Sequence, residues 1–282
     1  MKFQKLVGLS ILCLLGCQNQ SDQSAQAVVS YTNELSTKMA TSNAEANFVK
    51  KYQQFLNTTE DVDAYDKHGN TFLIAAIEEN NIPAIKLLLS QNANVNKASK
   101  GGITPLMAVI QNGNKSIPKI LRNGSITYID VKGSVNELLL KRLLDAGADV
   151  NLANEQGLTP LMVAASLGNK DAVEYLLENN SDFTKKDQNG LTALGYAVVN
   201  DHNEIVAQLV KAGSEVDVVD QQGQTPLMYA AENGLLDITK LLIQKGANVN
   251  ARDHYDVSPL QLATLQNHTD VAKYISRHGG KE

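Results

Sequence analysis

Residues that commonly carry chemistry are sparse in this 282-residue chain, which has two cysteines and five histidines. No G-x-S-x-G motif follows a strand-like segment, no H-E-x-x-H motif is present, and no Cys or His cluster has metal-ligand spacing. Residues 113–116 (GNKS) lack the adjacent Gly-Lys pair of a phosphate-binding loop. We therefore expect no enzyme activity, no cofactor and no metal site.

Cys17 is the one residue whose context predicts a modification. Lys2 and Lys5 precede an apolar run over residues 6–15, too short for a membrane-spanning helix but typical of an export signal. The run ends in Leu-Leu-Gly-Cys, which resembles the lipobox of bacterial lipoproteins. This resemblance implies cleavage before Cys17 and acyl chains on it, and an incidental cysteine is the alternative. Gln18 is not the aspartate that retains many lipoproteins in the inner membrane, which implies the outer membrane, facing the periplasm.

The predicted signal peptide covers residues 1–16, and residues 17–41 form a lipidated N-terminus and a polar, flexible tether. Cys13 leaves with the signal peptide, so the mature protein would have no disulfide. The net charge of −5 comes without a basic stripe, which argues against nucleic acid as a partner.

A 33-residue period organises the rest of the chain, because Gly157, Gly190 and Gly223 begin three copies of one pattern (190 − 157 = 223 − 190 = 33). A fixed period of this size predicts a solenoid, in which each unit covers the apolar face of its neighbour. The predicted units of this domain, residues 42–282, are a degenerate cap at 42–68, repeats that begin at Gly69, Gly102, Gly157, Gly190 and Gly223, and a final cap at 256–282.

Each repeat reads as two short helices and a turn. In the copy at Gly157, Thr159 and Pro160 are typical of a helix start, and Gly168 can close that helix in a left-handed conformation. A second helix is predicted from Lys170 to about Asn179, because its apolar residues recur every three or four positions. The fold class predicted is all-α, with helix-turn-helix repeats joined by β-turn loops.

These residues resemble the ankyrin-repeat family, whose signature contains G-x-T-P-L-H-x-A-A and L-L-x-x-G-A-x-V-N. The chain has TPLM beginning at Thr104, Thr159 and Thr225, GADVN at 147–151 and GANVN at 246–250. The histidine of TPLH is Met107, Met162 and Met228 here, so its hydrogen bonds must be replaced by thioether packing or be missing.

Histidines recur at another place in the repeat. His202 and His268 both lie twelve residues after the first residue of their unit (202 − 190 = 268 − 256 = 12). The family commonly has a structural histidine there, which favours packing over catalysis. We expect His68 and His254, in the turns, to be solvated or to contact a partner.

The step from Gly102 to Gly157 is 55 residues, 22 more than the period (157 − 102 = 55). The excess lies at about 113–134. Residues 114–121 begin like an outer helix, 123–124 read as a turn, 125–131 read as a β-branched strand, and a helix resumes from Val135 to Leu144. Insertions in repeats often lie on the binding side, and a tolerated surface loop fits this segment equally well.

The resemblance implies a concave binding face lined by the turn tips, the residue after each repeat glycine and the ends of the first helices. An apolar row at Ile103, Leu158, Leu191 and Val257 would have a polar surround, as protein interfaces do, or would simply pack the turns. The predicted partner-binding residues are Tyr65, Lys67, His68, Glu78, Glu79, Ile103, Gln111, Tyr128, Leu158, Leu167, Leu191, Val199, Val219, Glu232, Tyr255 and Val257.

The function predicted is that of a membrane-anchored periplasmic module that binds a protein. Resemblance to lipoproteins built from helical repeats implies an immunity protein that sterically inhibits a secreted antibacterial effector, such as a type VI phospholipase. The alternative is an envelope scaffold or adaptor that binds a periplasmic or membrane enzyme in a stress response. The expected partners are a protein and, through the acyl chains, a membrane.

Overall fold

A computed structural model describes residues 61–112, 116–120, 126–130 and 134–282, and it describes only the backbone at 116–120, 126–130 and 134–136. The predicted signal peptide, tether and lipidated Cys17, and residues 42–60 of the degenerate cap, lie outside the described residues. All described residues belong to the second of two units of the chain, residues 55–282.

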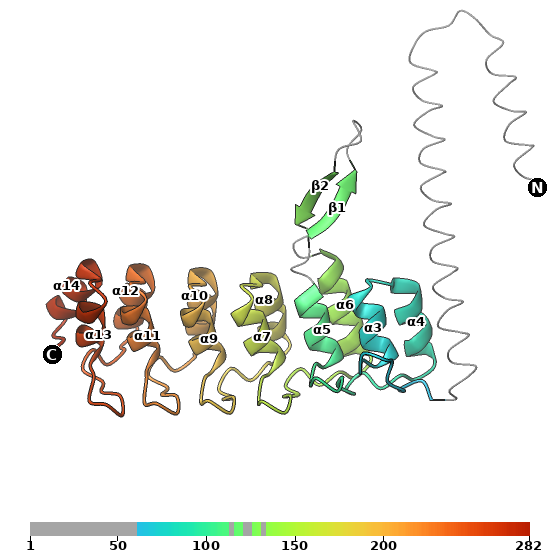
Figure 1. The fold of residues 1–282 in the computed structure, drawn as a ribbon, viewed down its shortest axis with the longest axis horizontal. Coiled ribbons are helices and arrows are strands. Elements are labelled where there is room, and N and C mark those ends of the chain that lie inside the picture. Colours follow the sequence, from blue (N-terminus) through green and yellow to red (C-terminus); the bar gives the residue numbers. More distant parts are fainter. Residues whose placement is uncertain (1–60, 113–115, 121–125, 131–133) are drawn as a thin grey trace, which may run out of the picture. The chain divides into compact units, whose positions relative to one another are not determined.

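The predicted all-α solenoid is confirmed, with one hairpin added. The described residues contain twelve helices in six consecutive pairs (Figure 1). The pairs are α3 (Phe72–Glu78) with α4 (Ile82–Ser90), α5 (Pro105–Asn112) with α6 (Ser134–Asp145), α7 (Pro160–Ser166) with α8 (Lys170–Glu178), α9 (Ala193–Val199) with α10 (Asn203–Ala212), α11 (Pro226–Glu232) with α12 (Leu236–Gln244), and α13 (Pro259–Leu265) with α14 (Thr269–Arg277).

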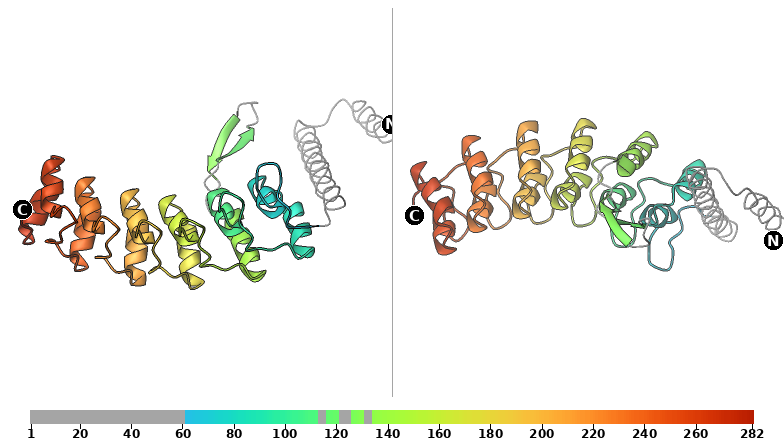
Figure 2. Two further views of the ribbon diagram at one scale, coloured as in Figure 1. Left: turned by 60° about the horizontal axis from the view of Figure 1, so that its bottom comes forward. Right: turned by 90° about the horizontal axis from the view of Figure 1, so that it is seen from above.

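The core is the series of contacts between successive pairs. The first helices, here called inner helices, pack on one another from α7 to α9, α11 and α13, and the second, outer helices follow the same order from α8 to α14 (Figure 2). Ala164 and Ala165 of α7, like Ala230 and Ala231 of α11, have no exposed surface. Helices of seven to twelve residues, as these are, are too short to be stable alone, so this stacking must hold them together.

The helix starts follow from the Thr-Pro pairs, and the thioethers complete them. Thr159 Oγ1 accepts the Met162 N–H at 3.3 Å, and Met162 Sδ accepts the Thr159 N–H at 3.5 Å. Thr225 and Met228 repeat this arrangement, with 3.4 Å from N to Sδ. The buried sulfur atoms thus accept a hydrogen bond that would otherwise be lost.

The insertion contains a hairpin of β1 (Ser116–Ile120) and β2 (Ile126–Asp130), which pair antiparallel from Ser116↔Asp130 to Ile120↔Ile126. The strand predicted at 125–131 is confirmed as β2, and the resumed helix is α6. The outer helix predicted to begin at 114–121 is wrong, because β1 lies there. The β-branched Ile117 and Ile120, one on each side of Pro118, favour an extended backbone opposite a second β-branched segment. The predicted turn at 123–124 lies outside the described residues.

Candidate protein-binding face

Four of the six described turns between repeats are held by one aspartate carboxylate each, and Ser99 and Asn154 take its place in the other two. Asp187 Oδ1 accepts the N–H groups of Asn189 at 3.0 Å and Leu191 at 2.7 Å. Gly190 has φ +83°, and a Cβ there would lie 2.9 Å from Cα of Asp220, so only glycine fits. The turn therefore has a fixed shape that presents the residue after the glycine in a defined place.

Four of the five pairs of successive described turns are hydrogen-bonded to one another, which aligns equivalent residues along those parts of the stack. In each bond a turn-tip N–H donates to a carbonyl of the turn before it. The bonds join Lys100 N to Gly69 O (2.8 Å), Gln188 N to Gln156 O (2.9 Å), Gln221 N to Asn189 O (2.8 Å) and His254 N to Gln222 O (2.9 Å). We call the surface formed by these turns and the inner helices the inner face.

Two tyrosine–aspartate pairs lie on the inner face. Tyr196 of α9 donates its hydroxyl to Asp187 Oδ2 at 2.8 Å, and Tyr229 of α11 donates to Asp220 Oδ2 at 2.5 Å. Burial raises the pKa of both phenols, and the hydrogen bond from each to its aspartate raises it further. Both tyrosines are half-buried, so each ring keeps an exposed part in a fixed orientation.

Sequence reasoning missed Tyr196 and Tyr229, although a signal was present. The two tyrosines are 33 residues apart, and each follows its aspartate by nine residues (196 − 187 = 229 − 220 = 9). A recurring pair of complementary polar groups at one repeat position predicts a repeated hydrogen bond.

The predicted partner-binding residues differ in accessibility. Ten have exposed side chains: Tyr65, Lys67, His68, Glu78, Glu79, Gln111, Leu167, Val199, Val219 and Tyr255. Five are half-buried: Ile103, Leu158, Leu191, Glu232 and Val257. Tyr128 lies in β2.

The predicted apolar row therefore packs partly inward. Leu191 is the clearest case, because Gly195 takes the place that Met162 and Met228 have in the neighbouring repeats. A Cβ on Gly195 would lie 2.8 Å from Leu191 Cδ2, so the leucine fills the space that a side chain there would need. Among the other predicted aliphatic residues, Leu167, Val199 and Val219 are more exposed, at 40%, 41% and 43%.

Of the residues predicted at the N-terminal end, Tyr65 contacts the turn of the next repeat. Tyr65 donates its hydroxyl to Ala98 O at 3.2 Å, and its ring centroid lies 4.7 Å from Nζ of Lys97 and 5.5 Å from Nζ of Lys100. Tyr65 lies before the first of these repeats and Tyr255 in the turn before the last. The stack thus separates these two tyrosines instead of bringing them together.

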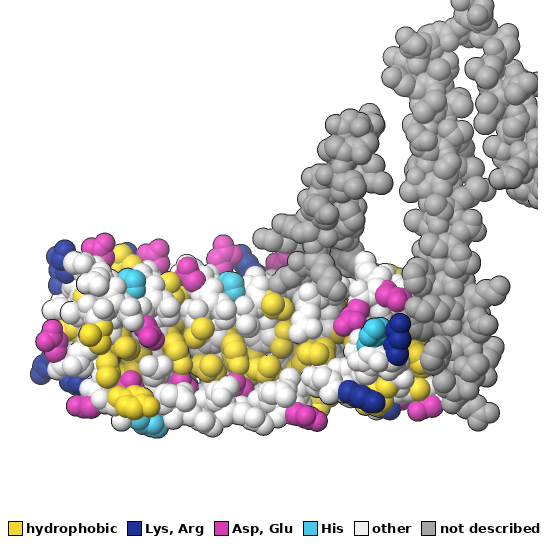
Figure 3. Space-filling view, viewed as in Figure 1, with side chains coloured by type: hydrophobic (Ala, Val, Ile, Leu, Met, Phe, Trp, Pro, Cys, Tyr) yellow, Lys and Arg dark blue, Asp and Glu magenta, His cyan; other side chains and the backbone are white. Residues whose placement is uncertain are grey.

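The middle of the inner face is apolar and acidic. Figure 3 shows a band of hydrophobic side chains across the repeats, with acidic side chains along its edges. From Glu155 to Gln266, the turn tips, the residues after the glycines and the ends of the inner helices include Glu155 and Glu232 but no lysine or arginine.

The recurring histidines have a structural role. His202 Nε2 lies 3.1 Å from Ser166 O, and His268 Nε2 lies 2.9 Å from Glu232 O. Because a carbonyl oxygen only accepts, each Nε2 must carry the proton. Each ring also lies against a left-handed glycine of the preceding repeat, Gly168 or Gly234. These contacts agree with the packing role predicted for both histidines.

The described residues offer neither a metal-ligand cluster nor a membrane-spanning helix. Within them, no group of three His, Cys, Asp or Glu side chains is placed to hold a metal ion. Among the helices of that same part of the chain, none combines the length and the apolar character needed to cross a bilayer.

Comparison with known proteins gives a consistent result. The family of ankyrin repeats (three copies) matches residues 38–132, 128–220 and 196–282. The human transient receptor potential cation channel subfamily A member 1 is 32% identical over 121 residues, 39% of this chain and 11% of the channel. An ankyrin-repeat protein of fowlpox virus is 32% identical over 133 residues (44% of this chain, 18% of that protein), and one of Rickettsia felis is 30% identical over 102 (35% and 38%). The chain thus spans less than half the length of each of these relatives.

Proposed function

The chain belongs to the ankyrin-repeat family, whose repeats mediate protein–protein interaction, and we propose from this premise that its inner face binds and inhibits a secreted antibacterial effector. In this proposal the protein is a periplasmic immunity protein held at the outer membrane by acyl chains on Cys17, and a type VI phospholipase is the kind of effector that fits. Inhibition is steric, because the bound solenoid covers the active site of the effector.

The proposal rests on two exposed apolar side chains, Leu167 and Val199, and on the two tyrosines whose hydroxyls are hydrogen-bonded to aspartates. Leu167 and Val199 have about the same exposure and end neighbouring inner helices, α7 and α9. Tyr196 belongs to α9, and its hydrogen bond to Asp187 fixes the ring before any partner arrives. Rigid aromatic side chains lose little conformational entropy on binding, which favours them as interface anchors.

The charge of this face indicates the kind of segment it accepts. Its middle repeats present Glu155 and Glu232 without a lysine or arginine at the equivalent positions. Opposite charge steers association and suppresses wrong partners. We therefore expect the effector to insert a segment with basic side chains around an apolar centre.

The membrane anchor gives the inhibitor its place of action. Each buried CH₂ group of an acyl chain contributes about 0.8 kcal/mol to membrane binding, so several chains retain a protein essentially permanently. An inhibitor held there meets a phospholipase at the surface which that enzyme attacks. Replacing Cys17 by serine should remove acyl chains from the mature protein, as mass spectrometry measures, and release it from the membrane fraction.

The main proposal predicts that an adjacent reading frame encodes the effector, and its test uses that product. Sensitive cells that express the full chain should survive secretion of this effector into their periplasm. Leu167→Asp and Val199→Asp should each weaken binding at least tenfold and reduce survival, because a charge would replace an apolar contact.

Leu138→Asp is the matched control. Leu138 is 51% exposed on the outer helix α6, so the substitution is chemically equal but lies off the inner face. Absence of protection by the unaltered chain would refute the immunity function. Binding to an envelope enzyme without protection would favour the adaptor alternative. Equal losses from all three variants would rule out a specific role for the inner face.

A further inference from the structure

At five of the six junctions between described repeats, a side chain at the last position of the V-N motif, or of its V-D equivalent, bonds to the next repeat. Asn151 Nδ2 donates to Asn180 O at 3.3 Å, and Asn151 Oδ1 accepts the Asp182 N–H at 2.7 Å. Asn250 makes the same two bonds, to Gly279 O at 3.0 Å and from Lys281 N at 2.8 Å. One carboxamide thus satisfies a carbonyl and an N–H of the next repeat.

Each of three other junctions has both of these hydrogen bonds or only the one to the N–H group. Asn96 makes both bonds, to Gly147 O at 3.1 Å and from Asp149 N at 2.8 Å. Asp63 and Asp217 are carboxylates, and they accept the N–H alone, from Asn94 at 2.8 Å and from Asn248 at 3.0 Å.

Thr184 breaks the series. It stands 33 residues after Asn151 and 33 before Asp217 (184 − 151 = 217 − 184 = 33). Its hydroxyl donates to Asp182 Oδ1 within its own loop, at 2.6 Å. Within the described residues, no side chain of the preceding repeat reaches Gly213 O or the Glu215 N–H, the two groups that a carboxamide would join at this junction.

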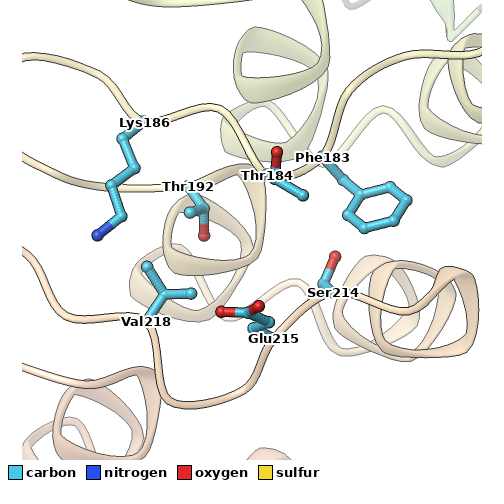
Figure 4. Close-up of a pocket in the computed structure, with 7 residues that line it drawn as sticks. All are labelled: Phe183, Thr184, Lys186, Thr192, Ser214, Glu215 and Val218. Atoms are coloured by element: carbon cyan, nitrogen blue, oxygen red, sulfur yellow. The ribbon is translucent and has the colours of Figure 1, made fainter.

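A cleft of about 170 Å³ lies at this junction, between residues 183–186 and 214–218. Figure 4 shows the Thr184 hydroxyl turned away from the Ser214 hydroxyl, which points into the cleft from the opposite loop. Ser214 is 9% exposed, and its buried Oγ has no hydrogen-bond partner in the described residues. Ser181 at the preceding junction is also unpartnered, so the missing bridge, and not the serine alone, sets this junction apart.

The walls of the cleft are already fixed. Lys186 Nζ donates to Val219 O at 3.0 Å and so joins the two loops at one end. Phe183 lies against Gly213, where an added Cβ would be 3.8 Å from the ring. The cleft would therefore not have to rearrange when a ligand binds, so little binding free energy would be lost in ordering its walls.

We propose that this cleft binds a primary carboxamide, supplied by the side chain of an asparagine or glutamine. The carboxamide oxygen accepts from the Glu215 N–H, and its NH₂ group donates to Gly213 O and Ser214 Oγ. A carboxylate lacks the donors and would be repelled by Glu215, and a hydroxyl cannot reach both backbone groups as one planar amide can. This site lies apart from the inner face, so it does not depend on the proposed function.

The test is an NMR titration of the full chain with propionamide, which has the same terminal group as a glutamine side chain. The Glu215 backbone amide resonance should shift saturably, with a Kd in the millimolar range expected for so small a ligand. Propionate, which has nearly the same shape, should shift it at least tenfold less at equal concentration. No shift with propionamide, or an equal shift with propionate, would overturn the proposal.

Two substitutions at Thr184 make the test specific. Thr184→Asn places a carboxamide of the chain itself in the cleft and should abolish the shift, whereas Thr184→Val preserves the cleft and should retain it. Retention in a folded Thr184→Asn protein would contradict the proposal, and if that variant does not fold, Ser214→Ala should weaken binding severalfold.

The peptide N-acetyl-Gly-Gln-Gly-amide separates two sources of the ligand. Tighter binding than propionamide would assign the site to a protein partner, and equal binding would assign it to a small amide.

Discussion

Tyr229 donates its hydroxyl to Asp220 Oδ2 at 2.5 Å, while Oδ1 of the same carboxylate accepts the N–H groups of Gln222 and Gln224. One aspartate therefore connects an inner helix to the turn before it. Tyr196 and Asp187 repeat the arrangement one unit earlier. The same contact thus shapes the turn and orients the ring that the proposed partner would meet.

Removing this hydroxyl should weaken the fold measurably. Tyr229→Phe leaves Asp220 Oδ2 without its donor, and we expect the free energy of unfolding to fall by about 1 kcal/mol. Urea denaturation monitored by circular dichroism measures the change. Tyr274→Phe on α14 is a control, because no hydrogen bond from that hydroxyl is seen in the described residues. An equal loss in both variants would mean that the aspartate bond contributes nothing special.

The two tyrosine pairs should make the protein sensitive to alkali. Burial and the bonds to aspartate raise the pKa of Tyr196 and Tyr229 in the folded state. Because the unfolded pKa is about 10, their contribution to stability is complete below that pH and declines as the pH rises toward the folded value. Urea midpoints from pH 8 to 11 should fall less steeply in the double variant Tyr196→Phe/Tyr229→Phe. An unchanged slope would contradict the shifted pKa values.

The packing of His268 on Gly234 predicts a coupled pair of substitutions. Gly234 has φ +71°, and an alanine Cβ there would lie 2.5 Å from His268 Nδ1. Gly234→Ala should therefore cost the left-handed strain of about 1–2 kcal/mol and a clash in addition. In the His268→Ala background only the strain should remain, and thermal or urea unfolding of the double-mutant cycle measures the difference.

Gly246→Ala is the control for that cycle, since φ is +91° and no atom lies within 4 Å of the added Cβ. Its cost should equal the strain alone. A cycle with no coupling between positions 234 and 268 would show that the histidine ring moves aside freely.

Completing the junction at Thr184 should stabilise the protein. Thr184→Asn can form the two bonds that Asn151 and Asn250 form at their junctions. We expect a gain of about 1 kcal/mol in the free energy of unfolding, measured by urea denaturation. Thr184→Val adds neither bond and should not be more stable than the unaltered chain. A loss of stability in Thr184→Asn would show that the loops cannot accept the bridge.

The repeat geometry was predictable because local chemistry and periodicity agree. Thr159 caps its helix, Gly168 adopts φ +71°, and the second helix begins at Lys170, as the pattern indicated. The start of the insertion was not predictable from helical spacing. Ile117 and Ile120 fit either an apolar helix face or a strand, and the pairing with residues 126–130 decides between them.

The alignment of the repeats predicted which positions are exposed on the inner face, but not which side chains contact one another there. Aligning the repeats identified Leu167 and Val199, which the structure finds exposed. The same alignment could not show that Leu191 turns toward position 195. The leucine has room there because residue 195 is a glycine and has no side chain. Tyr196 and Tyr229 escaped notice because each lies inside a seven-residue helix that reads as core. Recognising them required the aspartates of the adjoining turns.

The absence of a bridge at Thr184 also has a mechanical consequence. When a linear array is stretched from its two ends, every link carries the same tension, and the array yields at its weakest link. The loops on either side of Thr184 share Lys186 with Val219 as a cross-link but lack the carboxamide present two units away at Asn250. If one end is tethered and the other is held by a bound protein, we expect the loops at this joint to part before those joined at Asn250, while the packing of α7 on α9 and of α8 on α10 still holds the two repeats together.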